Sequence, residues 1–251
     1  MTTYSPSILI YFPCFMIKCE QYILSIVSKK LHKKKGLIRY YIMKINQLWQ
    51  EPKQRSKRYY LLDNIFSAIT HGIGFGLAIA GLVVLIVKAA HTGSPMRIVT
   101  FTIYGACLVL LYLFSTLYHS LVFTRAKNVF QIFDHSSIFL LIAGSYTPYS
   151  LVAIGGVWGW TLFGLIWGLT IFGIIYYVFN RGKHVIFDTI LYVAMGWLVI
   201  LSGPYLYVRL SSTGFWLLVG GGIAYTIGAI LFSMRSVPFI HTIWHLFVIL
   251  G

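Results

Sequence analysis

The segment VWGWTLFGLIWGLTIFGIIYYVF, residues 157–179, contains no charged side chain. A helix needs about 20 apolar residues to cross the hydrocarbon core of a bilayer, so this segment alone predicts a membrane span. Similar runs elsewhere give six predicted spans, at residues 67–87, 98–123, 133–154, 157–179, 186–208 and 213–233. The composition agrees, because 58% of the 251 residues are hydrophobic, 10% are charged, and the mean hydropathy is +0.80. The predicted fold class is an all-α membrane protein.

A seventh apolar run begins near residue 239 and is still apolar where the chain reaches Gly251. A helix of about a dozen residues is too short to cross the hydrocarbon core. We therefore expect a seven-transmembrane helix bundle whose last helix is truncated in this chain.

Residues 1–50 differ in character from residues 51–251. Their apolar part is interrupted by Pro6, Pro13, Lys18 and Glu20, which makes it a poor spanning helix. We interpret residues 1–50 as a basic N-terminal extension that is non-native or disordered, with the natural start at Met43. Residues 51–251 form the predicted seven-helix domain.

The formal net charge of +15 is unevenly distributed along the chain. Twelve of the 20 lysines and arginines precede residue 60, and such a basic flank marks the cytoplasmic side of a membrane protein. This pattern favours membrane lipids as partners and argues against nucleic acid. It predicts a multi-pass protein of the cell membrane (the inner or plasma membrane) with a cytoplasmic N-terminus. The three cysteines form neither a disulfide framework nor a metal-ligand pattern.

Small residues and prolines inside the spans predict how the helices pack and bend. Small residues four positions apart let helices approach closely, and prolines bend them. The glycine pairs are Gly72 with Gly76 and Gly164 with Gly168, and the prolines are Pro148 and Pro204.

Ionisable residues at membrane depth indicate function, because each is costly unless paired or hydrated. With the N-terminus inside, His119, Asp134, His241 and His245 all fall at cytoplasmic helix ends. His241 and His245 by themselves would suit two interfacial histidines equally well. Three imidazoles and a water, however, make up a typical catalytic zinc site. Asp134 is then the candidate general base, and the Ser115 hydroxyl, one turn before His119, is expected in the same cavity.

Other polar residues have simpler interpretations. Asp63 and Asp188 are expected to cap helix N-termini, where a carboxylate satisfies free amides and the helix dipole. His71 is expected to be a packed, hydrogen-bonded histidine rather than a ligand, and His135 is a less favoured candidate ligand.

Four ordered motifs resemble the bacterial hemolysin III proteins. They are DNIFSAITHGIG at 63–74, FSTLYHS at 114–120, DHSSI at 134–138 and HTIWHLF at 241–247. This family belongs to the progestin and adipoQ receptor superfamily, which is similar in turn to alkaline ceramidases. The resemblance spans about residues 55–251 and departs at Asp63, where many relatives carry glutamate.

The resemblance implies a seven-helix fold with zinc near the cytoplasmic face. The family's metal ligands fall on His119, His241 and His245, and its serine and aspartate on Ser115 and Asp134. We therefore expect an integral membrane protein of the hemolysin III type, functioning as a zinc-dependent hydrolase of a lipid amide or ester. The alternatives are a channel-forming cytolysin and a non-catalytic membrane-lipid sensor or receptor. A channel needs a continuous polar stripe, and the outer halves of these spans are apolar.

Overall fold

The computed structural model describes residues 36–41, 43, 44, 47, 55–180, 183, 185–234 and 236–251. The chain divides into two compact units, Met1–Glu51 and Pro52–Gly251. Residues 36–41 of the first unit are helical. The interpretation of residues 1–50 as an extension, and of Met43 as the start, falls mostly outside the described residues.

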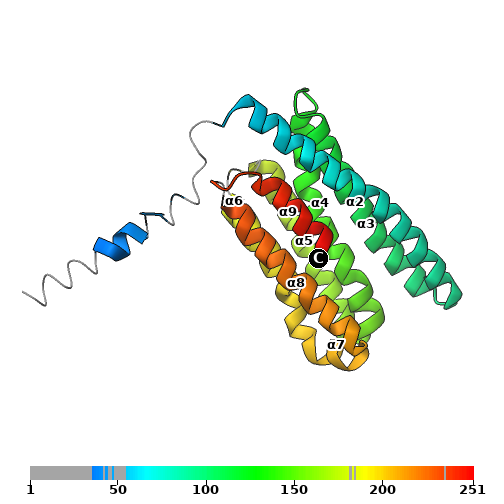
Figure 1. Cartoon of the computed structure of the whole chain (residues 1–251). Coiled ribbons are helices and arrows are strands. Elements are labelled where there is room, and N and C mark those ends of the chain that lie inside the picture. Colours follow the sequence, from blue (N-terminus) through cyan, green and yellow to red (C-terminus); the bar gives the residue numbers. More distant parts are fainter. Residues whose placement is uncertain are drawn as a thin grey trace, which may run out of the picture. The chain divides into compact units, whose positions relative to one another are not determined.

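In the second unit, every regular element of the described residues is helical (Figure 1). The α-helices are α2 Lys57–His91, α3 Pro95–Ser120, α4 Lys127–Pro148, α5 Gly156–Asn180, α6 Val185–Trp197, α7 Gly203–Arg209, α8 Ser212–Ser233 and α9 Ile240–Leu250. A π-helix, η1 Tyr149–Ile154, follows α4, and a 3-10 helix, η2 Leu198–Ser202, joins α6 to α7.

Six helical stretches within the described residues are long and apolar enough to cross a membrane. They coincide with the six spans predicted from the sequence, α4 with η1 forming one and α6, η2 and α7 another. The seventh, α9, has 11 residues and is apolar. The predicted all-α membrane bundle is confirmed.

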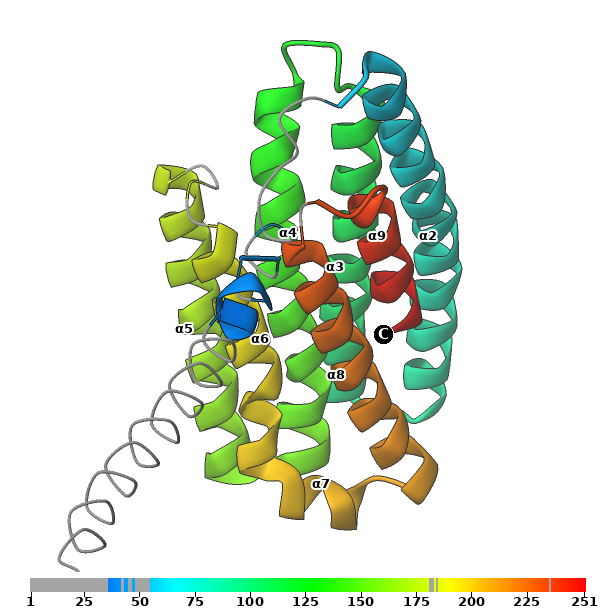
Figure 2. The same cartoon turned by 60° about the vertical axis from the view of Figure 1, so that its left-hand side comes forward.

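The arrangement of the bundle brings the last helix back to the first. The helices α2, α3, α4 and α5 pack as successive neighbours, and α9 contacts both α2 and α8 (Figure 2). Residues from the two ends of the second unit are therefore adjacent, as the candidate site requires.

The helix α2 begins at Lys57, well before the predicted span, because Ser56 caps it. The Ser56 side chain accepts a hydrogen bond from the backbone N–H of Tyr59 at 3.1 Å. Asp63 therefore lies in the second turn, and its predicted role as a helix cap is wrong. Asp188 does lie in the first turn of α6, where the helix dipole favours a carboxylate.

Both prolines interrupt their helices, as predicted. Pro148 ends α4, and the chain continues as the π-helix η1, in which the Ser150 hydroxyl donates to the carbonyls of Tyr146 and Thr147 at 2.8 and 3.2 Å. Pro204 stands at the start of α7, directly after the 3-10 segment. Hydroxyl groups and altered helix geometry thus satisfy the backbone groups at the breaks.

The tightest helix contacts are not at the glycines predicted to mediate close packing. A Cβ atom at Gly72 would lie 3.8 Å from Thr116, an ordinary contact, and one at Gly76, Gly164 or Gly168 would have open space around it. At Gly74 it would lie 2.6 Å from the Tyr112 ring, and at Gly173 it would clash with the Phe139 ring. The prediction failed because glycine spacing does not show which helix face meets a neighbour.

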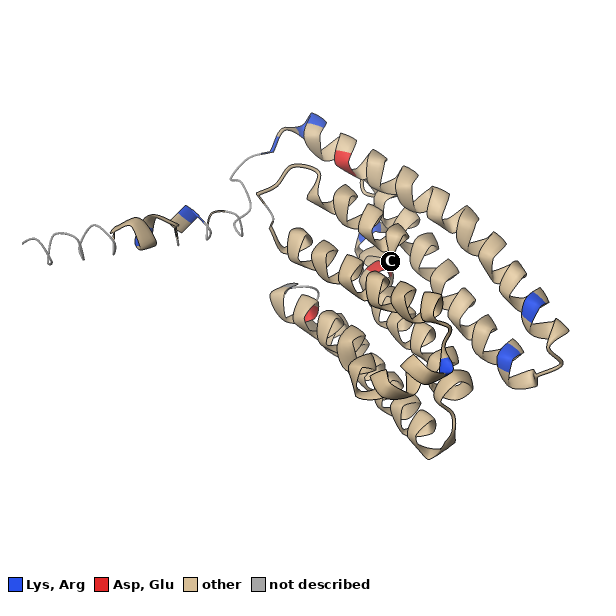
Figure 3. Ribbon diagram, turned by 60° about the horizontal axis from the view of Figure 1, so that its bottom comes forward, with Lys and Arg blue, Asp and Glu red and all other residues tan. Residues whose placement is uncertain are grey.

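The outer surface is apolar, and charge is confined to a few places. Figure 3 shows that charged residues are sparse and mostly near helix ends, while the helix middles carry almost none. Large apolar side chains such as Ile73, Leu77 and Ile223 are well exposed in the middle of their helices. Such a surface suits hydrocarbon rather than water.

Candidate metal centre

Polar side chains on three helices converge at one place in the bundle. The buried face of α2 presents Asn64, Ser67 and His71, which follow the spacing of one helix face. His119 lies in the last turn of α3, and His241 and His245 lie one turn apart at the start of α9. The α2–α3 and α2–α9 contacts bring these residues together.

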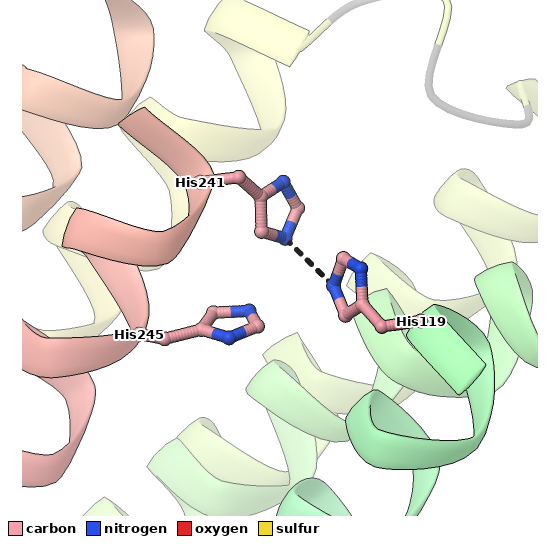
Figure 4. A group of neighbouring side chains, drawn as sticks. All are labelled: His119, His241 and His245. Atoms are coloured by element: carbon pink, nitrogen blue, oxygen red, sulfur yellow. Dashed lines mark hydrogen bonds between the residues drawn. The ribbon is translucent and has the colours of Figure 1, made fainter. Parts of the chain in front are cut away.

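The three histidines predicted as ligands, His119, His241 and His245, form a compact group. Each offers one ring nitrogen, and the three nitrogens all lie within 4.8 Å of one another. The Nε2 atoms of His119 and His241 are 3.1 Å apart, and the ring of His245 has its centroid 5.0 Å from that of His119 and 4.8 Å from that of His241 (Figure 4). We call these residues the histidine triad.

Hydrogen bonds from α2 hold two of the three rings in the triad. His119 Nδ1 faces Asn64 Oδ1 at 2.9 Å, and His245 Nδ1 faces the carbonyl oxygen of Ser67 at 3.2 Å and the Thr70 hydroxyl at 3.4 Å. A carbonyl oxygen only accepts, so Nδ1 of His245 carries the hydrogen. The Nε2 atom of that ring is then unprotonated and available as a ligand.

One distance in the triad matches that expected around a bound zinc ion. With Zn–N bonds of about 2.0–2.1 Å in tetrahedral geometry, two ligand nitrogens are about 3.3 Å apart. The 3.1 Å between the Nε2 atoms of His119 and His241 is close to this value. His119 and His245 are only 5% and 1% exposed, so these imidazoles cannot obtain their partners from bulk water. Three imidazole nitrogens within 4.8 Å of one another are close enough to bind a metal ion, and imidazole is a ligand type that suits zinc.

Asp134 and Ser115 are both buried. Ser115 is fully buried one turn before His119, and its hydroxyl lies beside the Asp134 carboxyl group without a well-formed hydrogen bond. The carboxylate oxygen of Asp134 is 3.6 Å from Nδ1 of its neighbour His135. None of the described contacts of Asp134 involves a triad imidazole, so its catalytic role stays a prediction.

His71 and His135 lie beside the site and outside the triad. His71 is stacked on His245, with centroids 3.4 Å apart, and touches the edge of Tyr112. It is packed as predicted, and neither ring nitrogen makes a well-formed hydrogen bond within the described residues, although the backbone of His245 lies near the ring. The hydrogen bonding expected of His71 stays a prediction. The His135 ring stacks on Tyr177, and its Nδ1 faces the Gln131 carbonyl at 3.0 Å.

Sequence reasoning missed the residues of α2 that contact the triad and α9. Asp63 Oδ1 accepts a hydrogen bond from the Thr242 hydroxyl at 3.0 Å, and Ser67 Oγ lies 3.1 Å from the same hydroxyl. Asn64 and Ser67 share a helix face with His71, and that spacing was the available signal. Neither residue is ionisable, so neither is marked by the cost of a charge at membrane depth.

The residue before α9 is held in a strained conformation. Phe239 has a φ of 55°, a left-handed conformation that is unfavourable for a residue with a side chain. Its backbone N–H donates to the Tyr59 hydroxyl at 2.6 Å, and Arg55 donates to the Val237 carbonyl at 3.2 Å. The start of α2 thus fixes the direction in which α9 begins, two residues before His241.

Comparison with known proteins identifies the family. The profile described as haemolysin-III related matches residues 59–251. The chain belongs to this haemolysin-III related family. The "Hemolysin-3" of Bacillus cereus is 47% identical over 192 residues, which cover 76% of this chain and 88% of that protein. The "Hemolysin-3 homolog" of Bacillus subtilis (strain 168) is 45% identical over 189 residues, or 75% and 89% of the two chains.

A more distant relative extends the comparison to animals. The human "Monocyte to macrophage differentiation factor" is 29% identical over 158 residues, which cover 60% of this chain and 64% of that protein. It fits the progestin and adipoQ receptor superfamily. The resemblance predicted from four motifs is confirmed, and the chain is an integral membrane protein of the haemolysin-III type.

Proposed function

We propose that this protein binds zinc through its histidine triad and hydrolyses an amide or ester bond of a membrane lipid. The observation that carries the proposal is the convergence of three imidazole nitrogens within 4.8 Å, contributed by α3 and α9, which are far apart along the chain. Three histidine ligands leave one position of a tetrahedral ion open, as in catalytic rather than structural zinc sites.

The proposed chemistry divides into a few roles. Zinc, when bound, acts as a Lewis acid and lowers the pKa of a coordinated water to about 7. The carboxylate of Asp134 accepts a proton from the water that adds to the lipid carbonyl. The Ser115 hydroxyl, one turn from His119, donates a hydrogen bond at the reacting carbonyl. Water is added across the bond, which gives a carboxylic acid and an amine or alcohol.

The proposed location follows from charge and from the apolar surface. Basic residues before the first span favour a cytoplasmic N-terminus, and with that orientation the triad would lie near the cytoplasmic face of the cell membrane. The substrate then reaches the site from the inner leaflet.

Metal analysis and a lipid panel test this function on the purified full chain. Asp134→Asn keeps the size of the side chain and removes the base, so it should retain zinc and lose about 10²–10⁴-fold in turnover. His245→Ala removes a ligand and should lose both zinc and turnover.

Asp188→Asn is the matched control for these variants, because Asp188 is also a buried carboxylate but lies on α6, away from the triad. It should keep both bound zinc and turnover. A zinc-loaded wild-type protein that cleaves no ceramide-like or acyl lipid would contradict the enzyme proposal.

The second candidate is a channel-forming cytolysin, which the name of the Bacillus cereus relative favours. Against it, the buried ionisable residues of the described chain lie on the first half of α2, the end of α3 and the starts of α4, α6 and α9. A continuous polar path across the bundle would need such groups at both ends. Dye release from vesicles by a His245→Ala variant that has lost hydrolysis would favour the channel. A protein with neither activity would favour a lipid sensor.

A further inference from the structure

Asn64 makes two hydrogen bonds at the point where α2 meets the end of α3. Its Nδ2 donates to the Tyr60 carbonyl at 2.8 Å, and its Oδ1 lies 2.9 Å from His119 Nδ1. The residue is 8% exposed, so water does not compete appreciably with either bond.

The bond to Tyr60 determines which amide atom faces the histidine. A backbone carbonyl only accepts, so the atom next to Tyr60 must be the donating Nδ2. The oxygen of the Asn64 amide is then fixed toward His119. Because this oxygen also only accepts, Nδ1 of His119 carries the hydrogen. The Nε2 atom of His119 then has a free electron pair on the side of His241.

The corresponding contact of His245 differs in kind. Its Nδ1 faces the main-chain oxygen of Ser67, which any residue at that position would supply. For His119 the acceptor is a side chain, and the identity of residue 64 therefore controls the state of the ring.

We propose that Asn64 is a positioning residue of the metal centre, which fixes the Nδ1–H tautomer and the orientation of His119. This proposal rests on the proposed zinc site. Outer hydrogen-bond partners of metal-ligating histidines set both the tautomer and the ring orientation, and their loss typically costs about 10–100-fold in metal affinity. Because the amide is neutral, Asn64 orients the ligand without adding a charge to the buried site.

The affinity test compares the wild type with three variants of the purified full chain, by zinc and Co²⁺ titration against a chelator. Asn64→Leu should weaken binding about 10–100-fold. Asn64→Asp keeps an acceptor oxygen at the same reach but loses the donation to the Tyr60 carbonyl, so it should bind zinc more tightly than Asn64→Leu and less tightly than the wild type. Asn180→Leu is the matched control, because Asn180 makes the same bond to a carbonyl four residues earlier, Tyr176, but touches no triad histidine. It should bind as the wild type does.

The tautomer is measured separately, by ¹⁵N NMR of histidine-labelled, metal-free protein with His119→Ala to assign the signal. In the wild type, His119 should be present as the Nδ1–H tautomer alone. In Asn64→Leu, the same ring should be a mixture of the two tautomers. Wild-type affinity in Asn64→Leu, or equally weak binding in Asn64→Asp, would overturn the positioning role.

An Nε2–H tautomer of His119 in the wild type would also overturn the positioning role of Asn64. If the wild type binds neither metal, the proposed function fails, and the tautomer measurement still decides the role of Asn64.

Discussion

Gly228 gives a way to test whether the position of α9 controls the metal centre. It lies in α8 at the contact with α9, and a Cβ atom there would be 2.6 Å from the Cβ of Phe247 and 2.9 and 3.0 Å from two ring atoms of Trp244. Phe247 and Trp244 flank His245 on the same helix. The substitution Gly228→Ala therefore pushes directly on the element that carries two of the three proposed ligands, without touching a ligand.

The size of the effect follows from these distances. Non-bonded carbon atoms are comfortable at about 3.5–4.0 Å, so the Cβ of Phe247 must move by about 1 Å. Metal–ligand distances tolerate only about 0.2 Å. Overpacking of this kind costs about 1–3 kcal/mol. The bound ion holds α9 in place, so the zinc-bound protein keeps this overpacking, whereas in the metal-free protein α9 can shift and relieve it. The affinity for zinc should then fall by about 5–150-fold.

The assay is zinc competition against a chelator, with the oligomeric state of each purified variant checked first. Gly220→Ala is the matched control on the same helix, because a Cβ at Gly220 has nothing within 4 Å. It should bind zinc as the wild type does. Equal affinity in Gly228→Ala and Gly220→Ala would refute the argument that the α8–α9 contact sets the geometry of the triad.

Two further predictions concern topology and metal removal. Reporter fusions at residues 125–128 and 181–184 should report cytoplasm, because basic residues there and before the first span favour that side; a signal from the opposite side at both positions would reverse the orientation. Chelation of zinc should lower the unfolding temperature of the wild type, since a ligand at 1,000 times its Kd stabilises the native state by about 4 kcal/mol. His245→Ala should show no such change, and an equal drop in that variant would mean that the chelator acts elsewhere.

Part of the candidate site was predictable from the sequence. The pairs Ser115 with His119 and His241 with His245 have the spacing of one helix face, and their place at span ends follows from the limits of the apolar runs. The structure brings His119 to the other two histidines, so that part of the arrangement agrees with the expectation. The catalytic roles of Asp134 and Ser115 stay predictions.

The partners of these residues were not predictable in the same way. Asn64 and Ser67 look like ordinary polar residues in a membrane helix until α2 is placed against α3 and α9. His71 was expected to be packed, but only the fold shows that its neighbours are the stacked ring of His245 and the edge of Tyr112. Asp63 was expected to cap a helix, but Ser56 begins that helix earlier, and the carboxylate binds Thr242 instead.

The sequence by itself determined the six spans, the breaks at Pro148 and Pro204 and the family, because hydropathy, proline geometry and motifs are properties of short stretches of chain. Only the tertiary structure decided which helix faces meet. The close contacts fall at Gly74 and Gly173 rather than at the paired glycines, and α9 lies against both α2 and α8. The physical reason is that in an apolar surrounding every helix face is similarly solvated, so hydropathy cannot mark the inward face. Packing of particular side chains and hydrogen bonds between helices select it instead.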